Sequence, residues 1–117
     1  MGKPHEQRDA WKFLMELAKA MYQMIATFPA EERDGLPQQM RRAAVSIPSN
    51  IAEGTGRHGV KEYLHFIGVA RGYLAELETQ LQRAGLLGFT TAVHAAFDFT
   101  DRVGKLLTGL HETWSAA

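Results

Sequence analysis

The sequence contains no cysteine, which excludes disulfide bonds, thiolate metal sites and cysteine nucleophiles. It also lacks a charge excess of either sign, because 13 Lys and Arg balance 13 Asp and Glu. This balance removes the strongest generic argument for nucleic-acid binding. No uncharged apolar run reaches the roughly 18 residues that a membrane-spanning helix needs. Residues 1–6 contain no signal-peptide core, so we expect a cytoplasmic protein without membrane contact.

The chain has 117 residues, of which 45% are hydrophobic and 22% are charged. These values are typical of one globular domain, which we expect to span residues 1–117. Strand-like alternation of apolar and polar residues is absent. The chain therefore has to build its core from helices.

Four segments carry apolar residues at alternating three- and four-residue steps, which is typical of amphipathic helices. The first ends at Pro29, and the others are expected at residues 36–53, at residues 60–84 and from about residue 90 onward. Pro48 lies inside the second segment and should kink or split that helix. The pattern predicts an all-α, antiparallel up-and-down four-helix bundle, with its second helix kinked at Pro48. The predicted core positions on the first and third helices are Trp11, Leu14, Ala18, Met21, Ile25 and Phe28, then Leu64, Ile67, Ala70, Leu74, Leu77, Leu81 and Ala84.

One face of the second segment is polar. Arg42, Ser46, Ser49 and Glu53 lie within about 60° of one another on an ideal helix, with Asn50 at the edge. One interpretation is a polar site in which Glu53 pairs with Arg42 or with a neighbouring subunit. The alternative is a solvated face whose helix-spaced pairs contribute a few tenths of a kcal/mol each.

The third segment has a face of small residues, formed by Gly68, Gly72, Ala75 and Thr79, on the side away from its leucines. Two glycines inside a helix cost roughly 1 kcal/mol each relative to alanine. Close approach of another backbone would offset that cost. We therefore expect this helix to be buried on two sides, against the second helix or another subunit, and the alternative is that the glycines have no role.

Residues for catalysis or metal binding are missing. Glu62 and His65 form a Glu-x-x-His element, but a di-iron site in a bundle needs two such elements and two further glutamates. The glycines at positions 54, 56 and 59 lack the surroundings of a phosphate-binding loop, and the serines lack a nucleophile elbow. We expect a non-enzyme with no cofactor and no metal.

A modest local excess of basic residues lies between residues 36 and 61. This stretch contains one acidic residue, Glu53, and four basic residues: Arg41, Arg42, Arg57 and Lys61. They are candidate contacts for nucleic-acid phosphates, although Arg41 and Arg42 point about 100° apart on a helix. The alternative is a structural role.

Two signatures, each made of two runs, resemble those of a known family. The runs at residues 28–33 (FPAEER) and 41–54 (RRAAVSIPSNIAEG), followed by residues 61–66 (KEYLHF) and 75–81 (AELETQL), closely resemble the signatures of the four-helix-bundle proteins also called the 23S rRNA-intervening-sequence protein family. The resemblance implies an up-and-down bundle of a bacterial protein that assembles as a homopentamer. It also marks Ser49, Asn50, Glu53 and Glu76 as structurally important, and it supplies no catalytic residue.

A relative of this family, the accessory protein of diversity-generating retroelements, resembles a basic pentameric barrel that binds nucleic acid. The present chain departs from that relative in its formal charge of zero. It also carries Gly59, where a Ser or Thr cap usually precedes the third helix. We expect a non-catalytic oligomeric scaffold or adaptor, with RNA or a ribonucleoprotein as a weak partner. The alternative is a nucleic-acid-binding accessory protein that acts through a basic ring surface.

Overall fold

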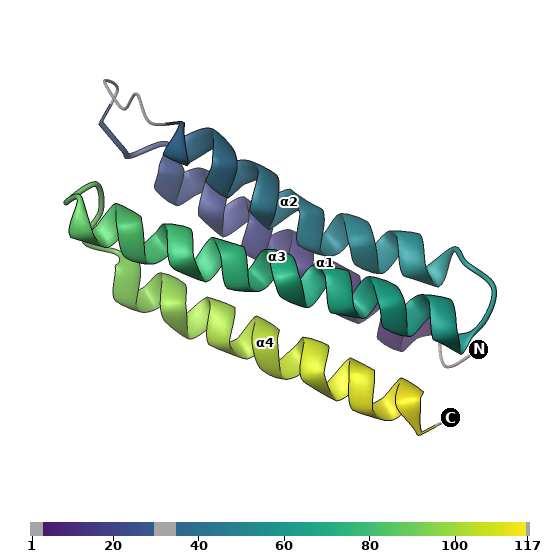
Figure 1. The fold of residues 1–117 in the computed structure, drawn as a ribbon. Helices are drawn as coiled ribbons and strands as arrows, with labels where there is room; N and C mark the ends of the chain where they lie inside the picture. The colour runs from purple at the N-terminus through teal and green to yellow at the C-terminus, as the bar shows by residue number, and fades with distance from the viewer. Residues whose placement is uncertain (1–3, 30–34, 117) are drawn as a thin grey trace.

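The computed structural model describes residues 4–29 and 35–116 of the chain. These residues form four helices and no strand: α1 (Pro4–Ile25), α2 (Leu36–Thr55), α3 (Val60–Leu86) and α4 (Val93–Ser115). Successive helices run in opposite directions, and both chain ends lie at the same end of the bundle (Figure 1). The prediction of an all-α four-helix bundle is confirmed. The charged connection expected at residues 30–34 lies outside the described residues.

The helices occupy the corners of an elongated bundle with extents of 47 × 22 × 19 Å. Each helix packs against its neighbours in the chain, and α1 also contacts α4. The contact between α2 and α3 is the most extensive, and the contact between α1 and α4 is the least. The helices α1 and α3 therefore stand at diagonal corners, with their outer faces pointing to opposite sides of the molecule.

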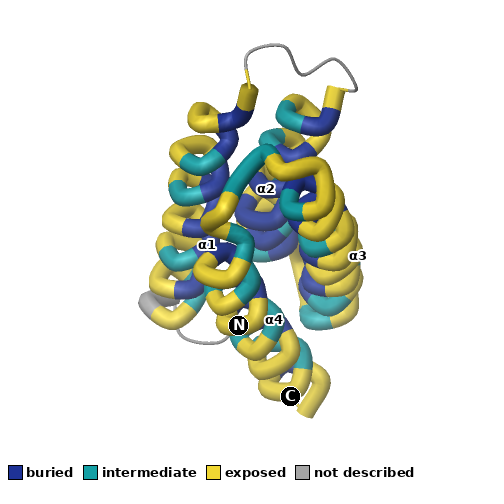
Figure 2. The backbone as a smooth tube through the Cα atoms, turned by 90° about the vertical axis from the view of Figure 1, so that its left-hand side faces the viewer, coloured by how far each residue is buried: buried dark blue, intermediate teal, exposed yellow. Residues whose placement is uncertain are grey.

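A single apolar core runs along the bundle axis, and the buried residues line the inner face of every helix (Figure 2). The apolar residues that recur at helical spacing in α2 are all buried: Leu36, Met40, Ala43, Ala44, Ile47 and Ile51. The largest fully buried side chains are Tyr63, Leu14, Leu17, Met21, Leu36, Met40, Ile47, Ile51, Ile67, Leu77, Leu81 and Leu107.

The structure corrects the core of α1 and α3 at four positions. Trp11, which was predicted in the core, is 37% exposed at the rim of α1. Leu17, which was not among the predicted core positions, is fully buried. On α3, Leu64 is only partly buried, whereas Tyr63 is fully buried. An aromatic residue one position away from the seam is drawn inward because burying its ring removes more apolar surface from water.

Two helix features differ from the sequence pattern. The helix α1 ends at Ile25, four residues before Pro29, and a turn follows in which the Thr27 hydroxyl donates to the Met24 carbonyl at 2.6 Å. The helix α2 continues through Pro48 to Thr55, so the expected split at this proline is wrong. The expected bend at Pro48 stays a prediction.

A close approach explains why the signature of α2 ends in glycine. A Cβ atom on Gly54 would lie 2.9 Å from the Tyr63 ring and 3.0 Å from the Phe66 Cβ atom. The last turn of α2 can therefore pack against the first turns of α3 only without a side chain at this position. The connection continues to Gly59, which has a φ of 100° and precedes α3 without a side-chain cap.

Candidate functional site

The polar face of α2 bonds mainly to its own helix. The hydroxyls of Ser46 and Ser49 donate to the carbonyls of Arg42 and Val45 at 2.7 and 2.8 Å. The Asn50 amide donates to the Ser46 carbonyl at 2.7 Å. Such bonds reach back one turn and compete with the helix ladder. These side chains therefore satisfy backbone carbonyls around Pro48 rather than joining one another.

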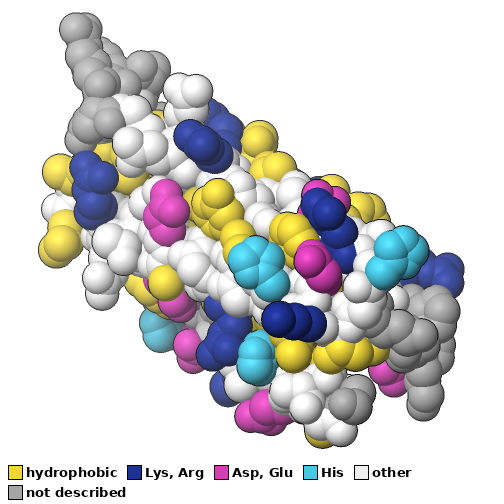
Figure 3. All heavy atoms as spheres, turned by 45° about the vertical axis from the view of Figure 1, so that its right-hand side comes forward, with side chains coloured by type: hydrophobic (Ala, Val, Ile, Leu, Met, Phe, Trp, Pro, Cys, Tyr) yellow, Lys and Arg dark blue, Asp and Glu magenta, His cyan; other side chains and the backbone are white. Residues whose placement is uncertain are grey.

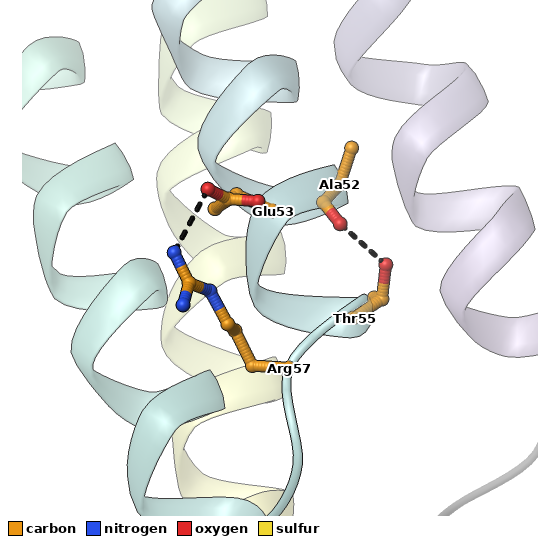
Figure 4. Close-up of polar contacts among 4 residues, drawn as sticks. All are labelled: Ala52, Glu53, Thr55 and Arg57. Atoms are coloured by element: carbon orange, nitrogen blue, oxygen red, sulfur yellow. Dashed lines mark hydrogen bonds and ion pairs between the residues drawn. The ribbon is translucent and has the colours of Figure 1, made fainter.

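The structure gives Glu53 a different partner from the expected Arg42. The Glu53 carboxylate accepts a hydrogen bond from the Arg57 guanidinium at 3.1 Å, and both side chains are about half exposed (Figure 4). The Arg57 guanidinium also lies 5.5 Å from the centre of the Phe66 ring. In the same turn the Thr55 hydroxyl donates to the Ala52 carbonyl at 2.8 Å (Figure 4). The ion pair between Glu53 and Arg57 joins the end of α2 to the loop that leads into α3.

The signature side chains collect along the groove between α2 and α3, in two separate hollows. One hollow is lined by Gln39, Arg42, Tyr73 and Glu76. The second is lined by Ser49, Asn50, Ala52, Glu53 and Phe66. The structure thus brings Arg42 and Glu76 together, but it separates them from the serine, asparagine and Glu53 of the same predicted set.

The small-residue face of α3 is open in this chain. Gly68, Gly72, Ala75 and Thr79 are all exposed, and a Cβ atom on either glycine would meet no atom within 4 Å. The expectation that α3 is buried on two sides is therefore wrong for the single chain. The helix α2 packs elsewhere on α3, which leaves another subunit as the remaining candidate to cover this face.

An exposed apolar surface between α1 and α2 was missed by the core prediction. Trp11, Met15 and Tyr22 of α1 are 37%, 43% and 44% exposed, and Val45 of α2 is 40% exposed. The spacing of the three α1 residues places them on one helix face, and this spacing was the available signal. We call these four residues the outer apolar face.

The candidate basic residues do not form one patch. The Arg41 guanidinium lies 5.8 Å from the centre of the Tyr22 ring at the α1–α2 side, while Arg42 lines a hollow on the α2–α3 side. Arg57 is paired with Glu53, and Lys61 belongs to the first turn of α3. Figure 3 shows a face on which basic, acidic and apolar side chains are interspersed. Such mixing gives no continuous path for a phosphate backbone on this face.

A cleft of about 530 Å³ opens between α1 and α4, the neighbouring helices with the least contact. Trp114 lines this cleft. The Tyr63 ring packs edge-on against the Trp114 ring, with the ring centres 5.1 Å apart. Burial raises the pKa of the Tyr63 hydroxyl, and the facing Gln7 side chain offsets part of this rise. Neither the hydroxyl nor the Gln7 Nε2 atom makes a hydrogen bond of good geometry.

Among the described residues, no group of three or more His, Asp or Glu side chains lies close enough together to hold a metal ion. Glu62 and His65 are both exposed on α3. None of the four helices is long and apolar enough to cross a membrane over the part of the chain that the structure describes.

The fold and the signature groove define the class: an all-α four-helix bundle whose α2–α3 face carries a distinctive polar motif. The chain belongs to the 23S rRNA-intervening sequence protein family, whose sequence model matches residues 6–109. No curated protein matches the chain. The matched range begins in the first turn of α1 and ends within α4, so it includes all of α2 and α3 and most of the other two helices.

Proposed function

We propose that this protein is a non-catalytic, cytoplasmic scaffold or adaptor that assembles with itself, most simply as a ring of five. The observation that carries this proposal is a pair of unlike surfaces on opposite sides of the bundle. The outer apolar face projects bulky side chains that are about 40% exposed. The small-residue face of α3 offers open space above Gly68 and Gly72.

Unlike surfaces favour a head-to-tail contact. When one face of a subunit binds a different face of the next, the assembly closes into a ring if the rotation between subunits permits it. Bulky side chains from α1 and α2 would pack over the small residues of α3, where the glycines allow close approach of the backbones. This contact would bury apolar surface that a single chain leaves in water.

Size-exclusion chromatography with light scattering tests the assembly. We expect a mass several times the 13.0 kDa of one chain. Met15→Glu on the outer apolar face and Gly72→Leu on α3 should each reduce the mass to that of a monomer. The matched controls are Leu87→Glu, at a residue 49% exposed in the turn that follows α3, and Gly109→Leu, at an equally open glycine of α4. A monomeric wild-type chain at micromolar concentration contradicts the proposal.

The second candidate function is a nucleic-acid-binding accessory protein. The local excess of Arg41, Arg42, Arg57 and Lys61 favours it, since a ring would repeat this cluster in every subunit. The dispersal of these side chains over different faces, and the pairing of Arg57 with Glu53, argue for weak binding at most. We therefore rank RNA or a ribonucleoprotein as a secondary partner.

A further inference from the structure

The outer apolar face of α1 and the small-residue face of α3 share one spacing. The outer apolar face has bulky side chains at residues 11, 15 and 22, and the small-residue face has two glycines and a threonine at residues 68, 72 and 79. In both helices the intervals are four and seven residues. Each set therefore covers about 16 Å of helix, at roughly 1.5 Å per residue. When the two helices lie side by side in the same direction, each of these bulky side chains can lie opposite a small one.

The two faces begin at the same height along the bundle. Trp11 lines a hollow between α1 and α2 together with Ala52. Ala52 also lines the hollow between α2 and α3 that contains Phe66. Trp11 and Phe66 therefore lie at one level, on opposite sides of α2. Gly68 follows Phe66 by two residues, which is about 3 Å along the helix axis.

The two faces also end at the same height. The Arg41 guanidinium of α2 lies 5.8 Å from the centre of the Tyr22 ring. Arg42, the next residue of α2, lines a hollow together with Glu76 of α3. Tyr22 thus lies near the level of Glu76, and Thr79 follows Glu76 by less than one helical turn. The bulky residues of α1 and the small residues of α3 span the same stretch of the bundle.

A rotation axis parallel to the bundle preserves both height and direction. Successive helices alternate in direction, so α1 and α3 run the same way (Figure 1). In a ring around such an axis, α1 of one copy runs parallel to α3 of the next copy and meets it at equal height. A head-to-tail contact that requires an offset along the axis builds an open helical filament instead. The matched heights therefore favour a closed ring.

Charge complementarity supports the same register. Arg41 borders the outer apolar face on its α2 side, and Glu76 borders the small-residue face on its α2 side, at the same level. The Glu76 Oε1 atom accepts a hydrogen bond from the Gln80 Nε2 atom at 3.3 Å, which leaves lone pairs of the carboxylate for another donor. The planar guanidinium of an arginine matches a carboxylate well, because it can donate two parallel hydrogen bonds.

We propose that the outer apolar face packs on α3 of a second copy, parallel and in register, with Met15 over Gly72 of the partner subunit. Arg41 then pairs with Glu76 of the partner subunit. This inference rests on the self-assembly proposed above and adds the arrangement of the contact. It gives the outer apolar face one occupant, the small-residue face of the neighbouring copy.

Introduced cysteines test the register, because the chain has no cysteine of its own. Met15→Cys with Gly72→Cys should form disulfides between subunits on mild oxidation, since the two β-carbons come within disulfide range, and a non-reducing denaturing gel should show a ladder of linked chains. The matched control, Met15→Cys with Thr79→Cys, moves one cysteine about 10 Å along α3 and should stay unlinked. All three positions are exposed. The helices α1 and α3 of one chain make no direct contact over their described residues, so neither pair can link within a chain.

Charge reversal tests the ion pair. Arg41→Glu and Glu76→Arg should each raise the protein concentration at which the assembly dissociates by about tenfold, because each places like charges across the contact. The two changes together should bring this concentration back to within about threefold of the wild type. Arg42→Glu with Glu76→Arg is the matched control, and it should not restore assembly, because Arg42 lines the hollow on the other side of α2.

The outcomes separate this inference from the assembly on which it rests. A monomeric wild type contradicts both. An oligomer in which the offset cysteines link as readily as the in-register cysteines overturns the register and leaves the assembly standing. Failure of Arg41→Glu with Glu76→Arg to restore assembly, or equal restoration by Arg42→Glu with Glu76→Arg, overturns the ion pair in the same way.

Discussion

At the scale of single residues, Tyr63 has an environment unlike that of any other tyrosine in the chain. It is fully buried, whereas Tyr22 is 44% exposed and Tyr73 is partly buried. Its ring packs against Trp114, and its hydroxyl faces the Gln7 side chain without a hydrogen bond of good geometry. Burial favours the neutral phenol over the phenolate, which is the physical cause of the raised pKa.

This raised pKa predicts a loss of stability in alkali. The free energy of unfolding should include the full contribution of the neutral Tyr63 below its ordinary pKa of 10.0, and should lose it as the pH rises toward the higher pKa of the folded state. Urea denaturation at a series of pH values measures this decline. Tyr63→Phe should remain within about 1 kcal/mol of the wild type at neutral pH, because the lost hydroxyl makes no hydrogen bond of good geometry. The variant should also show a shallower decline above pH 10, and an identical decline would contradict the assignment.

Glu53 provides a second prediction at this scale. Because its pair with Arg57 is half exposed, Glu53→Ala should lower the free energy of unfolding by less than about 1 kcal/mol. A double-mutant cycle with Arg57→Ala should give a coupling energy of about 0.3–0.5 kcal/mol that falls as salt is added. A loss of about 2–3 kcal/mol would instead show that another subunit buries this carboxylate in the assembly.

At the scale of elements, glycines have opposite roles on α2 and α3. Gly54 allows the end of α2 to pack against Tyr63, which cannot yield because its ring is fixed in the core. Gly72 on α3 faces open space. The same substitution should therefore have effects of opposite sign at the two positions.

Gly54→Ala should lower the free energy of unfolding by about 1–3 kcal/mol, because the new methyl group overpacks a close contact between helices. In a monomeric background such as Met15→Glu, Gly72→Ala should raise it by roughly 0.5–1 kcal/mol, the difference in helix propensity between the two residues. Thermal and urea denaturation of both variants measure the two effects. Equal effects would contradict the packing described for the α2–α3 junction.

At the scale of the whole molecule, the distribution of charge limits the binding of nucleic acid. Acidic and basic side chains are interspersed on the face that Figure 3 shows, and the formal net charge is zero. We expect little retention of generic RNA or duplex DNA at about 0.15 M salt, with a dissociation constant no tighter than about 10⁻⁴–10⁻⁶ M. Fluorescence anisotropy over a range of salt concentrations measures this. Tight binding with a steep salt dependence, removed by Arg41→Ala or Arg57→Ala, would favour the accessory-protein function.

The sequence by itself determined the number of helices, their approximate bounds and most of the core, because the spacing of apolar residues follows the helical period. It also identified the family through the motif that ends at Gly54. It did not predict that Trp11 lies at the rim and Tyr63 in the core, because both depend on which side chains the neighbouring helices leave room for. The pairing of Glu53 with Arg57 is local, four residues apart, and lies within reach of a sequence argument. The open α3 face and the α1–α4 cleft were decided by tertiary structure alone. Each depends on the distance between helices, and a period along one chain carries no information about that distance.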